Sequence, residues 1–323
     1  MEERMEYIVL DLEWNQSNTG KEDAVEKLPF EIIEIGAVKM NEKREPVDVF
    51  QRLIKPQVYN WIHDSIHEVI HVDYKDLADG LPFPEAVREF LDWCGDDFAF
   101  FTWGNQDVME LQRNMKYYDL LFLLPGPVKY YDVQKVFGMC CKEAGGRRSL
   151  EFAIDQLDIP KEQTFHRALT DARYTAMVLK WVDEKTLFTN YSMDVYQNPK
   201  KKKDELFLSY PDHDQYVSRE FTDRDKIMRD REVTSTKCPI CHLPAKRKIR
   251  WFMNNSKAYE SISLCQKHGY VKGKIRIRHT EEDRYYVIKT LKNVGNEKAE
   301  EIREKRDSLR KKRQIKRKSE KQI

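Results

Sequence analysis

The hydrophobic pattern of the first 190 residues alternates between short apolar runs and amphipathic stretches. Runs rich in β-branched and aromatic residues predict strands at Tyr7–Asp11, Glu31–Met40, Pro46–Ile54, Phe98–Trp103 and Tyr130–Asp132. Apolar positions three or four apart predict helices near Trp61–His71 and Pro84–Trp93, and helices that begin near Asp107, Val133, Ser149 and Arg167. Strands mixed with helices in this way indicate an α/β domain built on a central sheet.

Cysteines and histidines in the second half of the chain form two close pairs. They are Cys238-Pro239-Ile240-Cys241 and Cys265-Gln266-Lys267-His268, with 23 residues between Cys241 and Cys265. Two paired-ligand knuckles that bracket a hairpin-length segment are typical of a structural Zn²⁺ site, and the pattern resembles a zinc ribbon. His242 competes with His268 as the fourth ligand, but its place directly after Cys241 makes coordination awkward. The remaining cysteines are expected to be reduced, packed thiols: Cys94, Cys140 and Cys141.

The segments around the zinc pattern are strongly charged. A run of four lysines follows Pro199 and indicates the start of a linker. The C-terminal tail shows no core-forming periodicity, so we expect a charged helix or a disordered segment there. The sequence therefore predicts four parts: the α/β domain at 1–190, a charged linker at 191–232, the zinc-ribbon module at 233–280 and a charged, basic tail at 281–323.

The composition is that of a soluble protein with charged extensions, since 35% of the 323 residues are charged and 40% are hydrophobic. No apolar run approaches the roughly 20 residues of a membrane span, and the first residues do not form a secretory signal. We therefore expect a cytoplasmic protein with no membrane partner. The net charge of +2 conceals an asymmetry. Residues 303–323 carry eleven Lys/Arg and three Asp/Glu, so an acidic body precedes a basic tail.

Three separated segments supply four carboxylates and a histidine. Asp11 and Glu13 end the first predicted strand, and their spacing places both on one face. Asp107 opens a predicted helix. His166 precedes another helix, and Asp171 follows it by five residues, about one and a half turns on. Each acid alone is more often an ordinary strand-end or helix-start residue. Together, the oxygens suit a hard cation and the free histidine suits an attacking water.

The ordered set of Asp-x-Glu, a later Asp and His-x4-Asp resembles the DEDDh 3′–5′ exonucleases, including RNase T and the epsilon subunit of DNA polymerase III. The resemblance covers about the first 185 residues and implies an RNase H-like fold. Glu31 to Val38 resembles the family's second strand, and the residues from His166 to Ala172 resemble its third motif. The resemblance implies that Asp11, Glu13, Asp107 and Asp171 bind the metal and that His166 is the general base.

The resemblance also implies the reaction. Two Mg²⁺ or Mn²⁺ ions would support in-line hydrolysis of the last phosphodiester, with release of a nucleoside 5′-monophosphate from single-stranded RNA or DNA 3′ ends. Trp14, directly after Glu13, is expected either to stack on the terminal base or to pack in the core beside the first strand. Many family members have threonine at this position, and many have an aromatic residue where Gln106 precedes Asp107. These departures bear on the substrate more than on the chemistry.

Basic and aromatic residues in the zinc module also suggest nucleic acid. Lys272, Lys274, Arg276 and Arg278 alternate, so on a strand they line one face. Trp251 stands in a second basic segment. We expect Arg276 and Arg278 to contact phosphates and Trp251 to stack on a base, against the alternative of a solvated strand face with a packed aromatic residue.

Two other functions are compatible with parts of the sequence. One is a catalytically silent DEDDh-like module that regulates by binding, which the presence of all five catalytic residue types disfavours. The other is a zinc peptidase, because His67-Glu68-Val69-Ile70-His71 matches HExxH and His63 extends the histidine face. This five-residue pattern arises often by chance, and no clear third metal ligand follows it, so we rank the peptidase far below the exonuclease.

Overall fold

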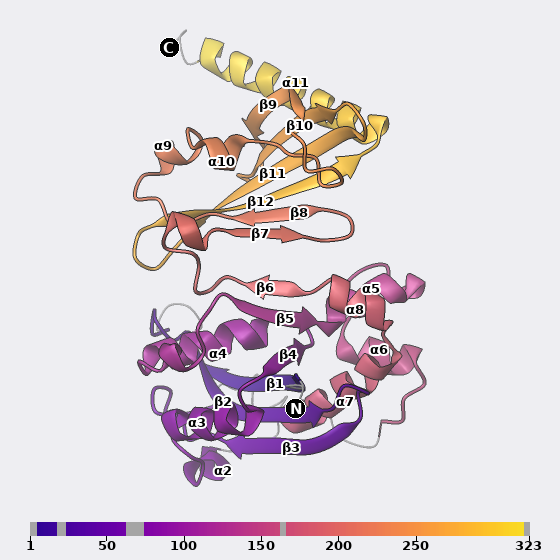
Figure 1. The fold of residues 1–323 in the computed structure, drawn as a ribbon. Coiled ribbons are helices and arrows are strands. Elements are labelled where there is room, and N and C mark those ends of the chain that lie inside the picture. Colours follow the sequence, from indigo (N-terminus) through magenta and orange to yellow (C-terminus); the bar gives the residue numbers. More distant parts are fainter. Residues whose placement is uncertain (1–4, 18–23, 63–73, 162–165, 320–323) are drawn as a thin grey trace. The chain divides into compact units, whose positions relative to one another are not determined.

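The computed structural model describes residues 5–17, 24–62, 74–161 and 166–319. The chain forms two compact units, Met1–Gln197 and Asn198–Ile323 (Figure 1). The HExxH pattern and most of the helix predicted at Trp61–His71 lie outside the described residues. Among the described helices, none combines the length and the apolar character needed to cross a membrane.

The first unit is built on a six-stranded mixed sheet with the order β3-β2-β1-β4-β5-β6. The strands are β1 (Glu6–Gln16), β2 (Phe30–Met40), β3 (Pro46–Leu53), β4 (Phe98–Thr102), β5 (Val128–Asp132) and β6 (Ser192–Asp194). The first three strands form an antiparallel meander, β4 and β5 continue parallel to β1, and β6 returns antiparallel. This arrangement confirms the predicted RNase H-like α/β fold.

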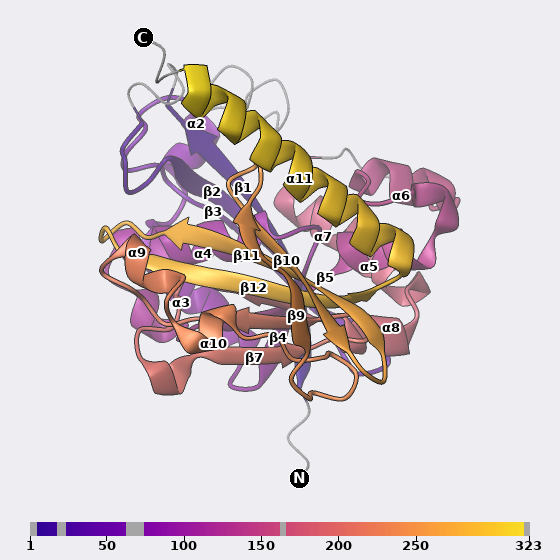
Figure 2. The same cartoon turned by 90° about the horizontal axis from the view of Figure 1, so that it is seen from above.

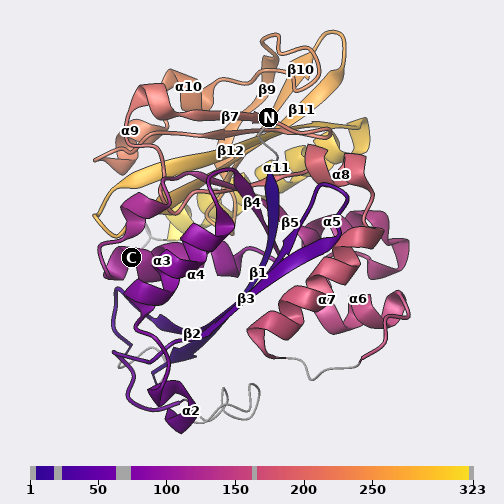
Figure 3. The same ribbon diagram turned by 60° about the horizontal axis from the view of Figure 1, so that its bottom comes forward.

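Helices cover both faces of this sheet because the apolar residues of β1 alternate between two cores. Ile8, Leu10 and Leu12 belong to the core that contains α3 (Phe83–Cys94) and α4 (Gln106–Tyr117). Tyr7 and Val9 belong to the opposite core. That core contains residues of α5 (Val133–Cys140), α6 (Leu150–Gln156), α7 (Ala168–Trp181) and α8 (Glu184–Thr189). Figure 3 shows the two groups of helices on either side of the strands.

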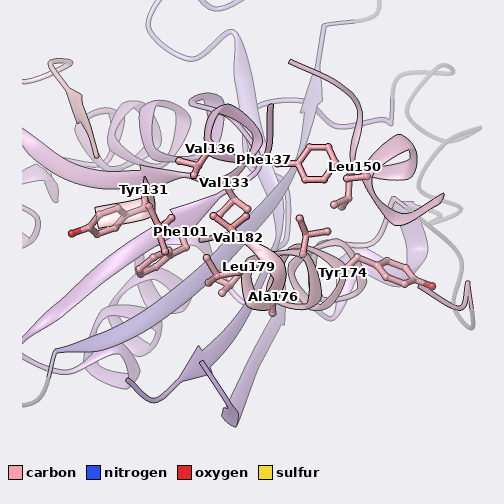
Figure 4. Packing of buried hydrophobic residues seen from close by; sticks show 14 of the residues in the cluster. Phe101, Tyr131, Val133, Val136, Phe137, Leu150, Tyr174, Ala176, Leu179 and Val182 are labelled. Atoms are coloured by element: carbon pink, nitrogen blue, oxygen red, sulfur yellow. The ribbon is translucent and has the colours of Figure 1, made fainter. Parts of the chain in front are cut away.

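The second of these cores fixes α7 against the central strands. The rings of Phe101 and Tyr131 stack with their centroids 4.7 Å apart. Phe137 from α5 and Leu179 from α7 are fully buried in the same cluster (Figure 4). Burial of each large apolar side chain contributes about 1.5–3 kcal/mol. The position of α7 matters because its first turn carries Asp171. The remaining elements of this unit are α2 (Tyr74–Ala78) and 3-10 turns at Leu121–Leu123 and Lys142–Ala144.

The second unit is built on a six-stranded antiparallel sheet with the order β7-β8-β12-β11-β10-β9. The strands are β7 (Leu206–Ser209), β8 (Asp214–Val217), β9 (Lys246–Met253), β10 (Tyr259–Cys265), β11 (Gly269–His279) and β12 (Tyr285–Val294). A 3-10 turn at Lys202–Asp204 precedes β7, and the short helices α9 (Arg224–Ile227) and α10 (Arg231–Thr234) lie between β8 and β9. The long helix α11 (Asn296–Ser319) crosses one face of the sheet (Figure 2), where Ala299 and Ile302 pack against Ile249 and Ile262.

The structure differs from the predicted boundaries in the second half of the chain. The predicted linker at 191–232 contains β6, β7, β8, α9 and the start of α10. The predicted tail at 281–323 supplies β12, a central strand of the second sheet, and then α11, which agrees with the charged helix expected there. The charged composition concealed β12 because Lys289 occupies an inward position at its middle. This buried ammonium donates hydrogen bonds to the carbonyl oxygens of Glu232 at 2.6 Å and Ser235 at 3.1 Å.

Candidate active site and zinc site

The acidic site begins on β1, where the strand leaves the core. Asp11 and Glu13 are two residues apart and continue the face to which Tyr7 and Val9 point, which is the α7 side of the sheet. The pairing of β1 with β2 shifts register between Glu13 and Trp14. Regular strand pairing therefore holds both carboxylates on one face, and it is interrupted only after Glu13.

Asp107 lies in the first turn of α4, just after β4. The connecting turn contains Gly104 with a φ of 116°, a conformation that favours glycine. The hydroxyl of Thr102 donates a hydrogen bond to the Gly104 carbonyl at 2.6 Å. The buried Asp107 carboxylate accepts a hydrogen bond from the backbone N–H of Leu12 at 3.2 Å. Asp107 is thereby fixed to the residue that separates Asp11 from Glu13.

Asp171 and His166 come from the start of α7. Asp171 lies in the first turn of this helix, and His166 precedes it with a left-handed φ of 67°. The backbone N–H of His166 donates a hydrogen bond to Oδ2 of Asp171 at 3.1 Å. The helix-start carboxylate thus holds the turn that presents the histidine, which is exposed.

Asp11, Glu13 and Asp171 meet in one group, with one oxygen from each carboxylate within 4.8 Å of the others. Asp107 stands outside this group, although it is the neighbouring charge that acts most strongly on Asp11. Burial is the main cause that raises the pKa of Glu13 to about 8, of Asp107 to about 7 and of Asp171 to about 6. Burial, followed by the charges of Asp107 and Glu13, also raises the pKa of Asp11 well above its usual range.

The donor set fits a hard divalent cation. All its ligand atoms are carboxylate oxygens, which Mg²⁺ and related ions prefer. Oδ1 of Asp171 is buried and has no hydrogen-bond partner among the described residues. A buried oxygen without a partner, among carboxylates that repel one another, gains most from a bound cation. The sequence therefore predicted a set of residues that the fold does bring together, with Asp107 held at its edge.

Trp14 follows Glu13 and is half-buried. It packs against the core on the α3 and α4 side, and its ring centroid lies 6.0 Å from that of Phe30. This contact agrees with the expectation that Trp14 packs in the core beside the first strand. The stacking of Trp14 on a terminal base stays a prediction.

Sequence reasoning did not single out two residues that lie against this site. Glu34 is a fifth carboxylate, on β2 directly opposite Glu13. Arg167 follows His166 and forms a bidentate ion pair with Glu34, at 3.0 and 3.1 Å. The signal available in the sequence was an acid inside the apolar run of β2, because a buried acid needs a partner.

The zinc ligands predicted from the sequence converge in the second unit. Cys238, Cys241, Cys265 and His268 form a group whose ligand atoms lie within 4.8 Å of one another. Sγ of Cys238 lies 3.5 Å from Nδ1 of His268, and Sγ of Cys241 lies 3.7 Å from Sγ of Cys265. Ligands placed about 2.0–2.3 Å from a tetrahedral Zn²⁺ have separations of this size. The cluster therefore supports a Cys3His zinc site.

Neighbouring contacts support this choice of ligands. Nδ1 of His242 lies 3.5 Å from Oδ2 of Asp214, and His242 is not part of the Cys3His group, so His268 is the fourth member. Burial acts against ionisation of the Cys265 thiol, but hydrogen bonds from the backbone N–H groups of Lys267 and His268 lower its pKa to about 6. A thiolate is the form of cysteine that binds zinc.

The residues expected to bind nucleic acid in this unit lie on two opposite faces of the sheet. Trp251 packs over Gly273, where an added Cβ would come within 2.4 Å of its ring, and its indole N–H donates to the carbonyl of Thr234 at 3.0 Å. Ile275 lies on that same face of β11, so Arg276 and Arg278 point to the other face. Trp251 therefore has a packing position, whereas Arg276 and Arg278 are exposed.

Comparison with known proteins agrees with this site. The sequence profile of the family described as Exonuclease (RNase T) matches residues 8–179, more than half of the chain. The chain therefore belongs to this exonuclease family, a family of nuclease hydrolases. The match confirms the resemblance predicted from the Asp-x-Glu, Asp and His-x4-Asp segments. No curated protein sequence matches the chain with significance.

The solved structures to which this chain is similar are distant in sequence. The nuclease domain of 3′hExo, a DEDDh family member bound to rAMP, is 18% identical, with 56% of this chain and 92% of that chain covered and a TM-score of 0.47. Cell-death related nuclease 4 is 16% identical, with coverages of 60% and 71% and a TM-score of 0.46. Pop2p of S. pombe, in a form with bound Mg²⁺ and Mn²⁺, is 17% identical, with coverages of 54% and 81% and a TM-score of 0.41.

Proposed function

We propose that the protein is a metal-dependent 3′–5′ exonuclease that releases nucleoside 5′-monophosphates from single-stranded RNA or DNA ends. The observation that carries this proposal is the convergence of Asp11, Glu13 and Asp171, with Asp107 bonded to the strand between the first two and His166 bonded to the third. The 3′–5′ direction and the product come from the family resemblance.

In this proposal, each residue has a distinct task. Asp11, Glu13, Asp107 and Asp171 would hold two Mg²⁺ or Mn²⁺ ions. When bound, these ions supply a nucleophile at neutral pH and stabilise the charge of the departing 3′-oxygen. His166 is exposed beside Asp171 and would accept the proton of the attacking water. Trp14 is half-buried and would stack on the terminal base.

The second unit would add affinity for single-stranded nucleic acid through a basic row, defined as Lys272, Lys274, Arg276 and Arg278 of β11. These four side chains share one face. Glu260 forms an ion pair with Lys272 of this row at 3.5 Å and a second one with Lys305 at 2.6 Å. Its single negative charge is therefore shared between two lysines. Burial and then the charges of Arg276 and Lys272 lower the pKa of Lys274. Bound phosphates would reduce the electrostatic repulsion among these basic side chains. Trp251, packed on the opposite face, has no part in this surface.

The direct test uses RNA and DNA of equal sequence, incubated with the full-length protein in Mg²⁺, Mn²⁺ or chelator. We expect nucleotide release with either metal, none in chelator, and loss of release in Asp11→Asn while the fold is retained. Metal-dependent release at the wild-type rate by Asp11→Asn would refute the assignment.

This assay tests the silent-module alternative, and a parallel assay with peptide substrates tests the peptidase alternative. A silent binding module would bind the strands and leave them intact at every metal concentration. A zinc peptidase would cleave peptides, with loss of cleavage in Glu68→Gln, but the match of residues 8–179 to the exonuclease family gives that activity no support.

A further inference from the structure

The start of α7 lies directly on the backbone of β2. A Cβ added at Gly36 would be 2.1 Å from the carbonyl carbon of Ala168 and 2.1 Å from the backbone nitrogen of Leu169. Such a distance is impossible for a real side chain, so glycine is required for this close approach. The contact determines how far α7 stands from the sheet, and therefore where the residues of its first turn lie relative to β1.

Glu34 fixes the same junction two residues earlier on β2. Its side chain is only 2% exposed, and its carboxylate accepts hydrogen bonds from Nε and Nη2 of Arg167 at 3.0 and 3.1 Å. It also accepts from Nε2 of Gln51 at 2.7 Å and from the backbone N–H of Ala168 at 3.5 Å. A bidentate guanidinium–carboxylate pair is directional as well as strong, so it sets the orientation of the chain at Arg167.

This junction is continuous with the acidic group. Glu34 is the cross-strand neighbour of Glu13, and Arg167 lies between His166 and the helix that carries Asp171. Glu34 is nevertheless absent from the group of carboxylates that meet at the candidate metal site. Its charge raises the pKa of Asp11, Glu13 and Asp171, whereas the charge of Arg167 opposes the rise at Glu13. The guanidinium therefore neutralises a fifth acid beside a site that already holds four.

From this geometry we propose that Glu34 and Arg167 are positioning residues for the proposed nuclease reaction, on which this inference rests. The pair seats the first turn of α7 on Gly36, so that His166 and Asp171 face Asp11 and Glu13. It also holds the Glu34 carboxylate away from the cations. Neither residue touches the reacting atoms in this account, and each acts through the placement of its neighbours.

The test compares Arg167→Gln, Arg167→Lys, Glu34→Gln and the double variant Glu34→Gln/Arg167→Gln in the full-length protein. Gln51→Leu is the matched control, because it removes a neutral donor from Glu34 and leaves the ion pair. Three quantities are measured: kcat and KM separately, the Mn²⁺ concentration for half-maximal rate, and the thermal midpoint. A purely structural role would move only the midpoint, since the assay runs well below it.

We expect Arg167→Gln to lower kcat by about 10²-fold with little change in KM, because a misplacement of about 1 Å near the reaction has an effect of that size. Its Mn²⁺ requirement should change as well, since the freed Glu34 carboxylate competes for the ion. The double variant should recover part of the lost rate, because it leaves no unpaired buried charge. Arg167→Lys should be intermediate, and Gln51→Leu should remain close to wild type.

A kcat of Arg167→Gln close to wild type would overturn the proposal, and so would a double variant with no recovery and an unchanged Mn²⁺ requirement. If Arg167→Gln does not fold, Arg167→Lys becomes the test variant. A wild-type kcat together with a wild-type Mn²⁺ requirement in Arg167→Lys would then refute the positioning role. An inactive wild-type protein would instead refute the proposed function, so the two failures are distinguishable.

Discussion

Asp171→Asn should make the metal-free protein more stable while it destroys activity. The wild-type side chain is held in a largely buried group of carboxylates, and its pKa is raised to about 6 from an ordinary value of 3.8. Asparagine has nearly the same shape and keeps an oxygen that can accept the hydrogen bond from the His166 backbone. The substitution therefore removes the charge and little else.

The magnitude follows from the pKa difference. Below pH 3.8 the carboxyl is protonated in both the folded and the unfolded chain, so it does not affect stability. Between that pH and about 6 the folded chain retains a proton that the unfolded chain has lost, so stability falls as the pH rises. Above pH 6 the full cost of the charge, about 2–3 kcal/mol, is present. Asp171→Asn should remove it, which corresponds to about 4–12 °C in the midpoint of a unit of this size.

Thermal unfolding in chelator at pH 4, 5, 6 and 7 measures this directly. The transition of the first unit is identified as the one that Mn²⁺ shifts in the wild type, since a ligand stabilises the unit that binds it. We expect equal midpoints at pH 4, a growing advantage for Asp171→Asn up to pH 7, and a smaller Mn²⁺ shift in the variant. Asp92→Asn, at an exposed position, is the control and should show no such trend. A variant that is no more stable than wild type at pH 7, or an advantage independent of pH, would refute the reasoning.

Three further predictions concern the other parts of the site. His166→Ala should lower kcat by about 10²–10⁴-fold with an unchanged thermal midpoint, as measured by nucleotide release at saturating substrate. Cys238→Ser should lose zinc in elemental analysis and destabilise only the transition that Mn²⁺ does not shift, while hydrolysis of short oligonucleotides continues. The variant Arg276→Gln/Arg278→Gln should reduce the slope of log affinity against log salt for long single strands by about 1.4, since each phosphate contact contributes about 0.7. An unchanged slope would exclude these two arginines as phosphate contacts.

The sequence predicted most of the first unit because its strands are apolar runs with little ambiguity. β1 and β4 are buried on both faces, so their composition alone distinguishes them from helices and loops. Once β1 is recognised as a strand, the two-residue spacing of Asp11 and Glu13 places both side chains on one face. The zinc ligands could also be predicted from the sequence, because the close spacing within each of the two pairs is itself the signal of a metal site.

Other features depended on contacts that no local pattern contains. Lys289 interrupts the apolar alternation of β12, and its burial is tolerated because carbonyl oxygens and the ring of Tyr216, 4.8 Å away, surround it. The opposite orientations of Trp251 and Arg276 follow from pairing between β9 and β10, which contains register shifts that the sequence does not reveal. The partner of Glu34 lies 133 positions further along the chain, at Arg167.

The proposed removal of nucleotides from the 3′ end of a single strand is tested most directly by the position of a label. One oligonucleotide is labelled at its 5′ end and a second, of identical sequence, at its 3′ end, and both are incubated with full-length protein and Mg²⁺ or Mn²⁺. We predict a ladder of shortening 5′-labelled products, and immediate release of the 3′ label as a nucleoside 5′-monophosphate. Immediate release of the 5′ label, or internal fragments without mononucleotides, would contradict the account.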